Sequence, residues 1–315
     1  MAFVSGSANS VSDLLTALQD VCVSNGYTLL GSVLRKGALY LRATVSGGLL
    51  KILGGTGIDG SNQLTEAGPA AVQLGATIGV PPVVSWPVSY SIHVLGSPDE
   101  VYLIVNSDID QYHWLAFGLN AAAGITGSGV WYGGTESELA PALGTKAIYI
   151  QPVMPGGGEG PQSCAALFWT AGNNNYRTVN AFIHHNLDSV GWSGGGTTFS
   201  LVAGGGSAVA GGPANAGRGV EVTVGRQPNA WNSDAVLLPI RPLVPRASLK
   251  CSQIGELTHA RYIRVTNYDP GEVIPLGSDR WRVYPWLRKN TATPNAGSNV
   301  THSGTLGWAI RYDGP

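Results

Sequence analysis

The sequence predicts a mainly β protein in which antiparallel sheets pack as a sandwich, with one N-terminal amphipathic helix and long Gly-rich loops. Three observations predict this class. Apolar and polar residues alternate in many short segments, and turn-forming residues separate those segments. Glycine is frequent, at 45 of 315 residues, and it clusters with Ala, Ser, Thr and Asn, which is typical of loops.

The beginning of the chain predicts the helix. Apolar residues recur at three- and four-residue spacing over residues 11–22. Ser10 or Ser12 can cap the first turn. Asn25-Gly26 ends the pattern.

Three strands are expected after the helix, at residues 27–34, 39–45 and 49–53. Gly47-Gly48 joins the last two, and a two-residue glycine loop suits a tight hairpin turn with positive φ. The leucines of the helix are expected to pack on this small sheet.

The densest aromatic segment predicts an antiparallel meander with strands at 90–94, 101–105 and 112–117 and turns at 96–99 and 107–110. Along its third strand, Tyr112, Trp114 and Ala116 point to one face, and His113, Leu115 and Phe117 to the other. Both faces are apolar. A second sheet of the chain is expected to cover one face and another subunit the other, with His113 as a hydrogen-bonded residue.

Beyond the meander, glycine and alanine predict a loop over residues 120–134. Later strands are expected at 146–153, 165–170, 178–184, 219–224, 235–243, 261–265, 281–285 and 306–312, the last two compatible with a sheet edge. Residues 191–219 are close to low complexity and predict a surface loop or arm. The expected division is a helix-plus-hairpin module at 1–60, a Pro/Gly connector at 61–89 and a larger β-rich domain at 90–315.

The composition argues against several classes of protein. Charged residues make up 12% and the net charge is -1, which gives no field that attracts a polyanion, so nucleic-acid binding is not expected. Cys22, Cys164 and Cys251 are far apart without CxxC spacing, which favours reduced thiols in a protein made in a cytoplasm. The sequence predicts neither a signal peptide nor a membrane span.

Two glycine motifs match known sites in spacing but lack the helix that each site needs. Residues 55–60 have the GxGxxG spacing of dinucleotide-binding loops, yet no βαβ unit surrounds them, so no bound cofactor is expected. Residues 191–195 match the nucleophile elbow GxSxG, with His184 and His185 shortly before it. Glycines follow where the elbow requires a helix, so a hydrolase is not expected.

His184, His185 and Asp188 are residue types that bind metal ions. Adjacent residues of a strand point to opposite faces, so the two histidines cannot share an ion unaided and no metal site is expected.

The acids beside the meander are Asp99, Glu100, Asp108 and Asp110. Paired carboxylates are what glycoside cleavage requires. Their turn positions explain them more simply, because Asp makes local hydrogen bonds in turns. No catalytic residue is assigned.

Aromatic residues in glycine-rich segments are the candidate interface residues. Trp131, Tyr132 and Trp192 lie where packing inside a sheet is hard to arrange, and exposed Trp and Tyr rings bind partners or stack on sugars. His113 is the fourth candidate, as an inter-subunit residue of the meander.

Segments over most of the chain carry a family resemblance. They are the strand 112–118, with the pattern aromatic-His-x-x-x-Phe-Gly, the pair Gly133-Gly134, residues 274–277 leading to 281–285, and residues 303–304 leading to 309–312. Together with the N-terminal helix and hairpin, they resemble a group of virion structural proteins of tailed bacteriophages, found in the tail, baseplate and neck.

The resemblance implies a non-enzymatic structural component of the virion, without cofactor or metal. Such a protein is made in the host cytoplasm and assembles in the tail or baseplate with copies of itself and other virion proteins. Glycine-rich loops are then expected to extend onto neighbouring subunits. The alternative is a receptor- or glycan-binding protein at the tail tip, which holds a bacterial surface receptor through aromatic residues in loops 124–134 and 186–219.

Overall fold

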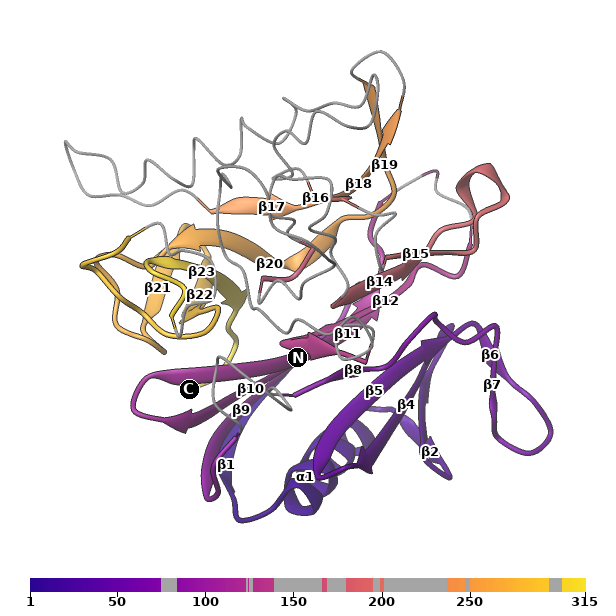
Figure 1. The fold of residues 1–315 in the computed structure, drawn as a ribbon, viewed down its shortest axis with the longest axis horizontal. Coiled ribbons are helices and arrows are strands. Elements are labelled where there is room, and N and C mark those ends of the chain that lie inside the picture. The colour runs from indigo at the N-terminus through magenta and orange to yellow at the C-terminus, as the bar shows by residue number, and fades with distance from the viewer. Residues whose placement is uncertain are drawn as a thin grey trace.

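The computed structural model describes residues 1–74, 84–122, 124, 127–138, 166–168, 180–194, 199–200, 237–246, 250–294 and 302–315. Strands dominate this part of the chain and form five antiparallel sheets (Figure 1). They accompany one α-helix, α1 (Val11–Ser24), and a 3-10 turn, η2 (Leu187–Ser189). The predicted fold class is confirmed.

Helix α1 begins and ends where the sequence predicts. Ser10 is its N-cap, and the Ser10 hydroxyl accepts a hydrogen bond from the backbone N–H of Asp13 at 3.1 Å. Asn25 is its C-cap, and Gly26 follows with a left-handed φ of 87°. The buried face of the helix carries Leu14, Leu18 and Cys22.

Helix α1 packs against a six-stranded sheet of order β13-β8-β5-β4-β3-β2. Its strands are β2 (Thr28–Leu30), β3 (Val33–Lys36), β4 (Leu39–Ser46), β5 (Leu49–Gly55), β8 (Val72–Gln73) and β13 (Glu136–Ser137). Segment 27–34, predicted as one strand, forms two, because the chain turns at Gly31 with a φ of 62°. The glycine hairpin is confirmed, with φ values of 60° at Gly47 and 74° at Gly48.

A seven-stranded sheet of order β1-β9-β10-β11-β12-β14-β15 lies at the centre of the molecule. Its strands are β1 (Ala2–Ala8), β9 (Val88–Leu95), β10 (Glu100–Asp108), β11 (Gln111–Leu119), β12 (Val130–Gly134), β14 (Ala181–His184) and β15 (Trp192–Gly194). The predicted meander is confirmed as β9, β10 and β11. Two further strands were not predicted from the sequence: β1, which pairs with β9, and β12, which pairs with β11 and β14.

The C-terminal residues form a five-stranded sheet of order β17-β20-β23-β22-β21. Its strands are β17 (Leu238–Ile240), β20 (Leu257–Arg264), β21 (Val273–Leu276), β22 (Asp279–Pro285) and β23 (Leu306–Arg311). Strands β22 and β23, expected to suit an edge, lie inside the sheet. The two small sheets consist of β16 (Phe199–Ser200), β18 (Pro242–Arg246) and β19 (Lys250–Gln253), and of β6 (Gly57–Ile58) and β7 (Leu64–Thr65).

Strand β11 separates two apolar cores. Tyr112, Trp114 and Ala116 belong to the core shared with the five-stranded sheet, and Leu115 and Phe117 to the core shared with α1 and the six-stranded sheet. The predicted alternation is confirmed. The expectation that another subunit covers one face is wrong, because the chain itself buries every residue from 111 to 118.

Tryptophan rings fill the core between the seven-stranded and five-stranded sheets. The ring centroids of Trp286 and Trp308 are 4.4 Å apart, and Trp114 lies 5.2 Å from Trp308. Tyr102 contacts Trp308 at 5.6 Å and Trp131 at 6.0 Å. Large rings bury more apolar area than any other side chains, so this cluster is a main source of the attraction between the two sheets.

The two ends of the chain meet on β9. The Phe3 ring of β1 lies 4.9 Å from the rings of both His93 and Tyr312. The Arg282 guanidinium lies 4.8 Å from the Phe3 ring centroid and 5.4 Å from that of Tyr312. Such cation–π contacts strengthen the aromatic packing. Both ends accordingly appear near each other in Figure 1.

Strand pairs cross both expected domain boundaries. Strand β1, within residues 1–60, pairs with β9 of the meander, and β8, within the expected connector 61–89, pairs with β5 and β13. The β6–β7 hairpin also crosses the first boundary, because β6 lies within residues 1–60 and β7 within residues 61–89. The expected strands 146–153 and 219–224, and residues 195–198 and 201–219 of the expected arm, lie outside the described part of the chain.

Candidate functional site

Two of the predicted interface residues are fully buried. Trp131 and Tyr132 lie in β12, between β11 and β14. The expected loop is wrong here, because Gly133 serves close packing and not a turn: a Cβ on it would lie 2.6 Å from Leu167 Cδ1. Neither ring leaves surface for a partner to contact.

Tyr132 connects the central sheet to the segment that follows β7. Its hydroxyl donates to the Ala70 carbonyl at 2.8 Å, and its ring lies against Phe182 at 5.2 Å between centroids. A Cβ on Gly54 would lie 2.6 Å from the Tyr132 ring, so glycine is required there. Burial raises the pKa of the Tyr132 phenol well above its ordinary value, which keeps the hydroxyl a neutral donor.

The two histidines of the meander are buried and neutral. Burial lowers the pKa of His113 to about 4, and neither ring nitrogen has a hydrogen-bond partner among the described residues. The expected hydrogen bond of His113 is therefore not seen within the described part of the chain, where the chain itself buries the ring completely. His93 Nε2 lies 3.0 Å from the Tyr284 hydroxyl, and burial, with a smaller contribution from Arg282, lowers its pKa to about 3.

Trp192 is the predicted interface residue that keeps partial exposure. It lies on β15, the edge strand of the central sheet. Its indole N–H donates to the Glu66 carbonyl at 2.7 Å. Its ring centroid lies 5.6 Å from that of Tyr132 and 5.3 Å from that of His184. These contacts hold the indole in one orientation.

His184 has a defined tautomer. Its Nδ1 accepts a hydrogen bond from the backbone N–H of Ser128 at 2.9 Å, so the hydrogen of the neutral ring is on Nε2. Burial lowers the pKa of His184, and the nearby Glu66 carboxylate opposes that shift. Among the described residues, no three His, Cys, Asp or Glu side chains group as metal ligands.

The GxSxG segment does bring a serine to a histidine. His185 Nε2 and Ser193 Oγ are 2.6 Å apart, and the residues are 1% and 2% exposed. The backbone N–H of Leu187 donates to His185 Nδ1 at 2.9 Å, so the hydrogen is on Nε2 and is donated to Ser193. A general base needs a lone pair on the nitrogen that faces the serine, so this tautomer does not activate Ser193.

The GxGxxG segment is part of a β-hairpin. It starts in β5 and continues through β6 into the turn before β7. The Asp59 carboxylate accepts hydrogen bonds from the backbone N–H groups of Ser61 at 2.8 Å and Gln63 at 2.9 Å. A strand follows this turn, so no helix N-terminus is presented to a pyrophosphate.

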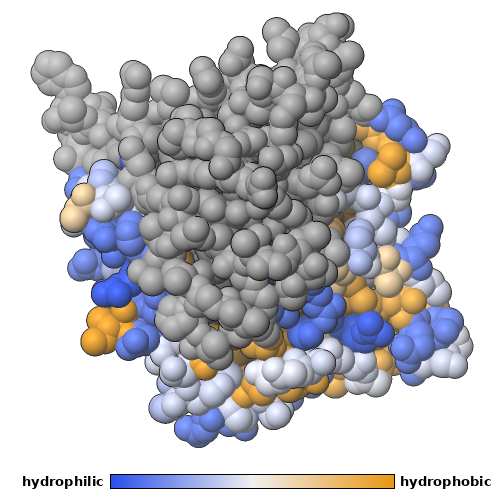
Figure 2. Space-filling view, viewed as in Figure 1, coloured by the Kyte–Doolittle hydropathy of each residue, from blue (hydrophilic) through white to orange (hydrophobic). Residues whose placement is uncertain are grey.

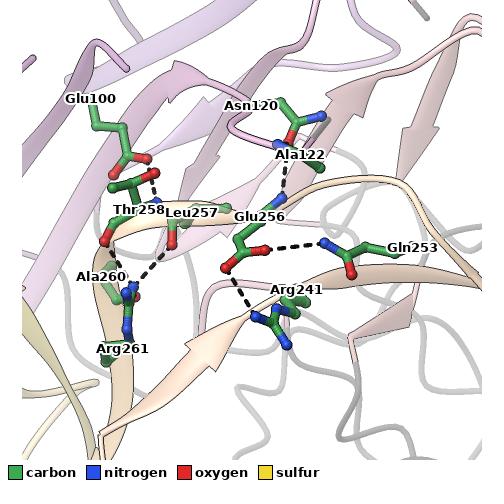
Figure 3. Close-up of polar contacts among 10 residues, drawn as sticks. All are labelled: Glu100, Asn120, Ala122, Arg241, Gln253, Glu256, Leu257, Thr258, Ala260 and Arg261. Carbon is green, nitrogen blue, oxygen red and sulfur yellow. Dashed lines mark hydrogen bonds and ion pairs between the residues drawn. The ribbon is translucent and has the colours of Figure 1, made fainter. Parts of the chain in front are cut away.

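Glu100 is a fully buried acid, although the sequence predicts a turn position. It is the first residue of β10. Its carboxylate accepts a hydrogen bond from the backbone N–H of Thr258 at 2.8 Å (Figure 3). It accepts another from the backbone N–H of His259 at 3.0 Å. The Tyr102 hydroxyl donates to the same carboxylate at 2.5 Å. Glu100 therefore ties the central sheet to β20 of the five-stranded sheet.

Burial raises the pKa of Glu100 to about 7. The hydrogen bonds from Tyr102, Thr258 and His259, and the charge of Arg261, favour the carboxylate and oppose this shift. Glu100 and Tyr102 are two residues apart, and residues two apart in a strand share a face. The sequence therefore indicated that the two side chains could meet, although Glu100 was assigned to a turn.

A second polar cluster surrounds Glu256, just before β20 (Figure 3). Arg241 Nη2 lies 3.1 Å from its Oε1, and Gln253 Nε2 lies 3.3 Å from its Oε2. The Glu256 backbone N–H donates to Asn120 Oδ1 at 2.8 Å, which also accepts from the backbone N–H of Ala122 at 2.9 Å. The cluster attaches the end of β11 to the start of β20.

Local partners explain two of the other acids of the meander. Asp99 forms an ion pair with Lys36 at 2.8 Å. Asp108 accepts a hydrogen bond from the backbone N–H of Ile109 at 2.7 Å. Asp110 has a φ of 55° in the same turn, a left-handed conformation that Asp tolerates.

The chain matches no protein-family model and no curated protein. Within the described ranges, no helix has both the length and the apolar character needed to cross a membrane.

Proposed function

We propose that this chain is a non-enzymatic structural component of a tailed-bacteriophage virion and that it belongs to the tail or baseplate. It assembles there with copies of itself and with other virion proteins after synthesis in the host cytoplasm. The sequence segments that resemble virion structural proteins are the reason for placing the chain in a virion.

The contacts of buried acidic, serine and histidine side chains support a structural role. Glu100, the most deeply buried of the meander acids, accepts one hydrogen bond from Tyr102 of its own strand and two from backbone N–H groups of β20, and the latter two join the sheets. The Ser193–His185 pair is buried and holds the tautomer that donates to serine. Residues that would carry catalysis elsewhere serve here as internal links.

Single exposed apolar side chains offer contacts for assembly. Ile109, at the tip of the β10–β11 hairpin, is 81% exposed, and Leu276, on the edge strand β21, is 59% exposed. Elsewhere, hydrophilic and hydrophobic residues are intermixed on the coloured part of the face in Figure 2. Small contacts of this kind suit packing among several neighbours.

Mass spectrometry of purified particles from the phage that encodes this chain tests the proposal. The chain is expected among the proteins of washed, density-purified virions in a constant copy ratio to the other components. Its presence in the infected-cell lysate together with its absence from such particles would overturn the proposal.

A further inference from the structure

The surface around Trp192 combines a fixed aromatic ring with polar groups from other segments. We call Trp192, Glu66 and His184 the Trp192 cluster. Strand β15 supplies the indole, the residue after β7 supplies the carboxylate, and β14 supplies the imidazole. Trp192 is half-buried, so its position is fixed while part of it stays accessible.

Glu66 is exposed at the rim of the cluster. Its carbonyl holds the indole N–H at 2.7 Å, and its carboxylate accepts a hydrogen bond from the Thr56 hydroxyl at 2.8 Å. Its φ of 41° is left-handed, which is uncommon for a residue with a long side chain. Backbone strain of this kind is held by surrounding contacts and concentrates at functional sites.

His184 supplies a donor. Because Ser128 occupies Nδ1, the ring carries its hydrogen on Nε2, for which the described residues show no hydrogen-bond partner. Gly191 lies beside that edge of the ring: a Cβ there would be 3.4 Å from Nε2, and His184 is the only described residue that it would meet within 4 Å. His184 as a whole is 7% exposed, and the absence of a side chain at Gly191 leaves the Nε2 edge of its ring uncovered on that side.

The loop from Asn186 to Val190 borders the cluster in an ordered conformation. Asn186, Asp188 and Ser189 have left-handed φ values of 52°, 56° and 61°. The backbone N–H of His185 donates to the Gly191 carbonyl at 3.0 Å across the base of the loop. Val190 is 45% exposed and adds apolar surface two residues from Trp192.

We propose that the Trp192 cluster binds a neutral saccharide. The apolar face of a sugar ring stacks on the indole, a sugar hydroxyl donates to the Glu66 carboxylate, and another accepts from His184 Nε2–H. This role goes beyond the structural function proposed above and does not depend on it.

The charges of the cluster decide among ligand classes. The Glu66 carboxylate disfavours nucleic acids and anionic glycans by repulsion. A quaternary ammonium ligand would match the indole and a carboxylate, but it would offer nothing to the N–H of His184. A hydroxyl group both donates and accepts, so a neutral sugar matches all three residues.

Titration of the purified full-length chain with neutral oligosaccharides tests the proposal. The probes are oligomers of glucose, mannose, galactose and N-acetylglucosamine, followed by saturation-transfer NMR and calorimetry, with choline as the cationic comparison. At least one oligosaccharide is expected to bind. Trp192→Ala should weaken it by about five- to thirtyfold, since loss of a stacking ring costs on the order of 1–2 kcal/mol.

Trp86→Ala is the matched control, because Trp86 is likewise half-buried against the same apolar core. It should bind the sugar like the unmodified chain, while Glu66→Gln should weaken binding several-fold without changing the melting temperature. Failure of every oligosaccharide to bind, binding of choline alone, or equal affinity of the Trp192 and Trp86 variants would overturn the proposal. None of these results bears on whether the chain is found in virions.

Discussion

At the residue scale, the informative side chains are ionisable groups held neutral or satisfied inside the protein. Glu100 shows how: burial raises its pKa to about 7 while three hydrogen bonds oppose the shift. Its ordinary value is 4.5, so between pH 4.5 and 7 the folded chain binds a proton that the unfolded chain releases. The contribution of Glu100 to stability is therefore present at low pH and is lost as pH rises through 7.

Glu100→Gln tests this linkage. In the unmodified chain, the Glu100 contribution to the free energy of unfolding should fall by roughly 1–3 kcal/mol between pH 5 and pH 8. His93 and His113 act in the opposite sense, because their lowered pKa values favour the folded state at higher pH. Urea unfolding of both proteins at both pH values isolates Glu100, since the histidine contributions cancel in the difference. Identical pH dependence of the two proteins would contradict the assignment.

Ser193→Ala tests the buried serine–histidine pair. Removing the hydroxyl leaves His185 Nε2–H without the acceptor that lies 2.6 Å away, which should cost about 1–3 kcal/mol. Thermal unfolding should show the loss, and Ser189→Ala, in an exposed position of the same segment, serves as the control. A variant with unchanged stability would show that the hydrogen bond has no structural role.

At the element scale, β12 carries the largest difference between expectation and structure. Its glycines and alanine-rich approach predict a loop, yet it is a buried strand with Trp131 and Tyr132 in opposite cores. Trp131→Phe should lower the free energy of unfolding by roughly 1–3 kcal/mol through the cavity it leaves. Trp192→Phe, on a half-exposed ring, should cost less than about 1 kcal/mol in the same denaturant measurement. Equal losses would contradict the difference in burial.

Local patterns account for the elements that the sequence predicts. The Ser10 cap, the Gly47-Gly48 turn and the alternation of β9 to β11 each depend on neighbouring residues, so they can be recognised without the fold. Strand β12 could not be recognised in this way. Its Gly133 is needed because Leu167, which is distant in sequence, packs too closely for a side chain at that position. The same holds for the candidate site: Trp192 stands out by type, but its partner Glu66 lies 126 positions away.

At the scale of the whole molecule, one chain supplies three layers. The central sheet shares one core with α1 and the six-stranded sheet and another with the five-stranded sheet. The aromatic strand β11 is therefore satisfied without a neighbouring subunit. In the proposed assembly, contacts are expected from hairpin tips and sheet edges, and not from an open face of this strand.

Ile109→Asp tests that consequence for a virion component. Ile109 is 81% exposed, so the variant should unfold within about 0.5 kcal/mol of the unmodified chain. In phage carrying the substitution, its incorporation into particles should fall, as measured by quantitative mass spectrometry of virions. Ile109→Val is the control and should be incorporated normally. Normal incorporation of the aspartate variant would show that this hairpin tip makes no contact needed for assembly.

The contact between Phe3 and Tyr312 brings the two ends of the chain close together. A short linker from residue 315 to residue 2 should join the ends without displacing any strand, and new ends could then be opened at the exposed Gly60 of the β6–β7 turn. Such a circular permutant is expected to keep the β-rich circular dichroism spectrum and cooperative unfolding of the original. Such a result would show that the sheets form whatever the sequence position at which the chain starts. The pairing of β1 with β9 would then depend on their proximity in the folded protein, and not on which of them is synthesised first.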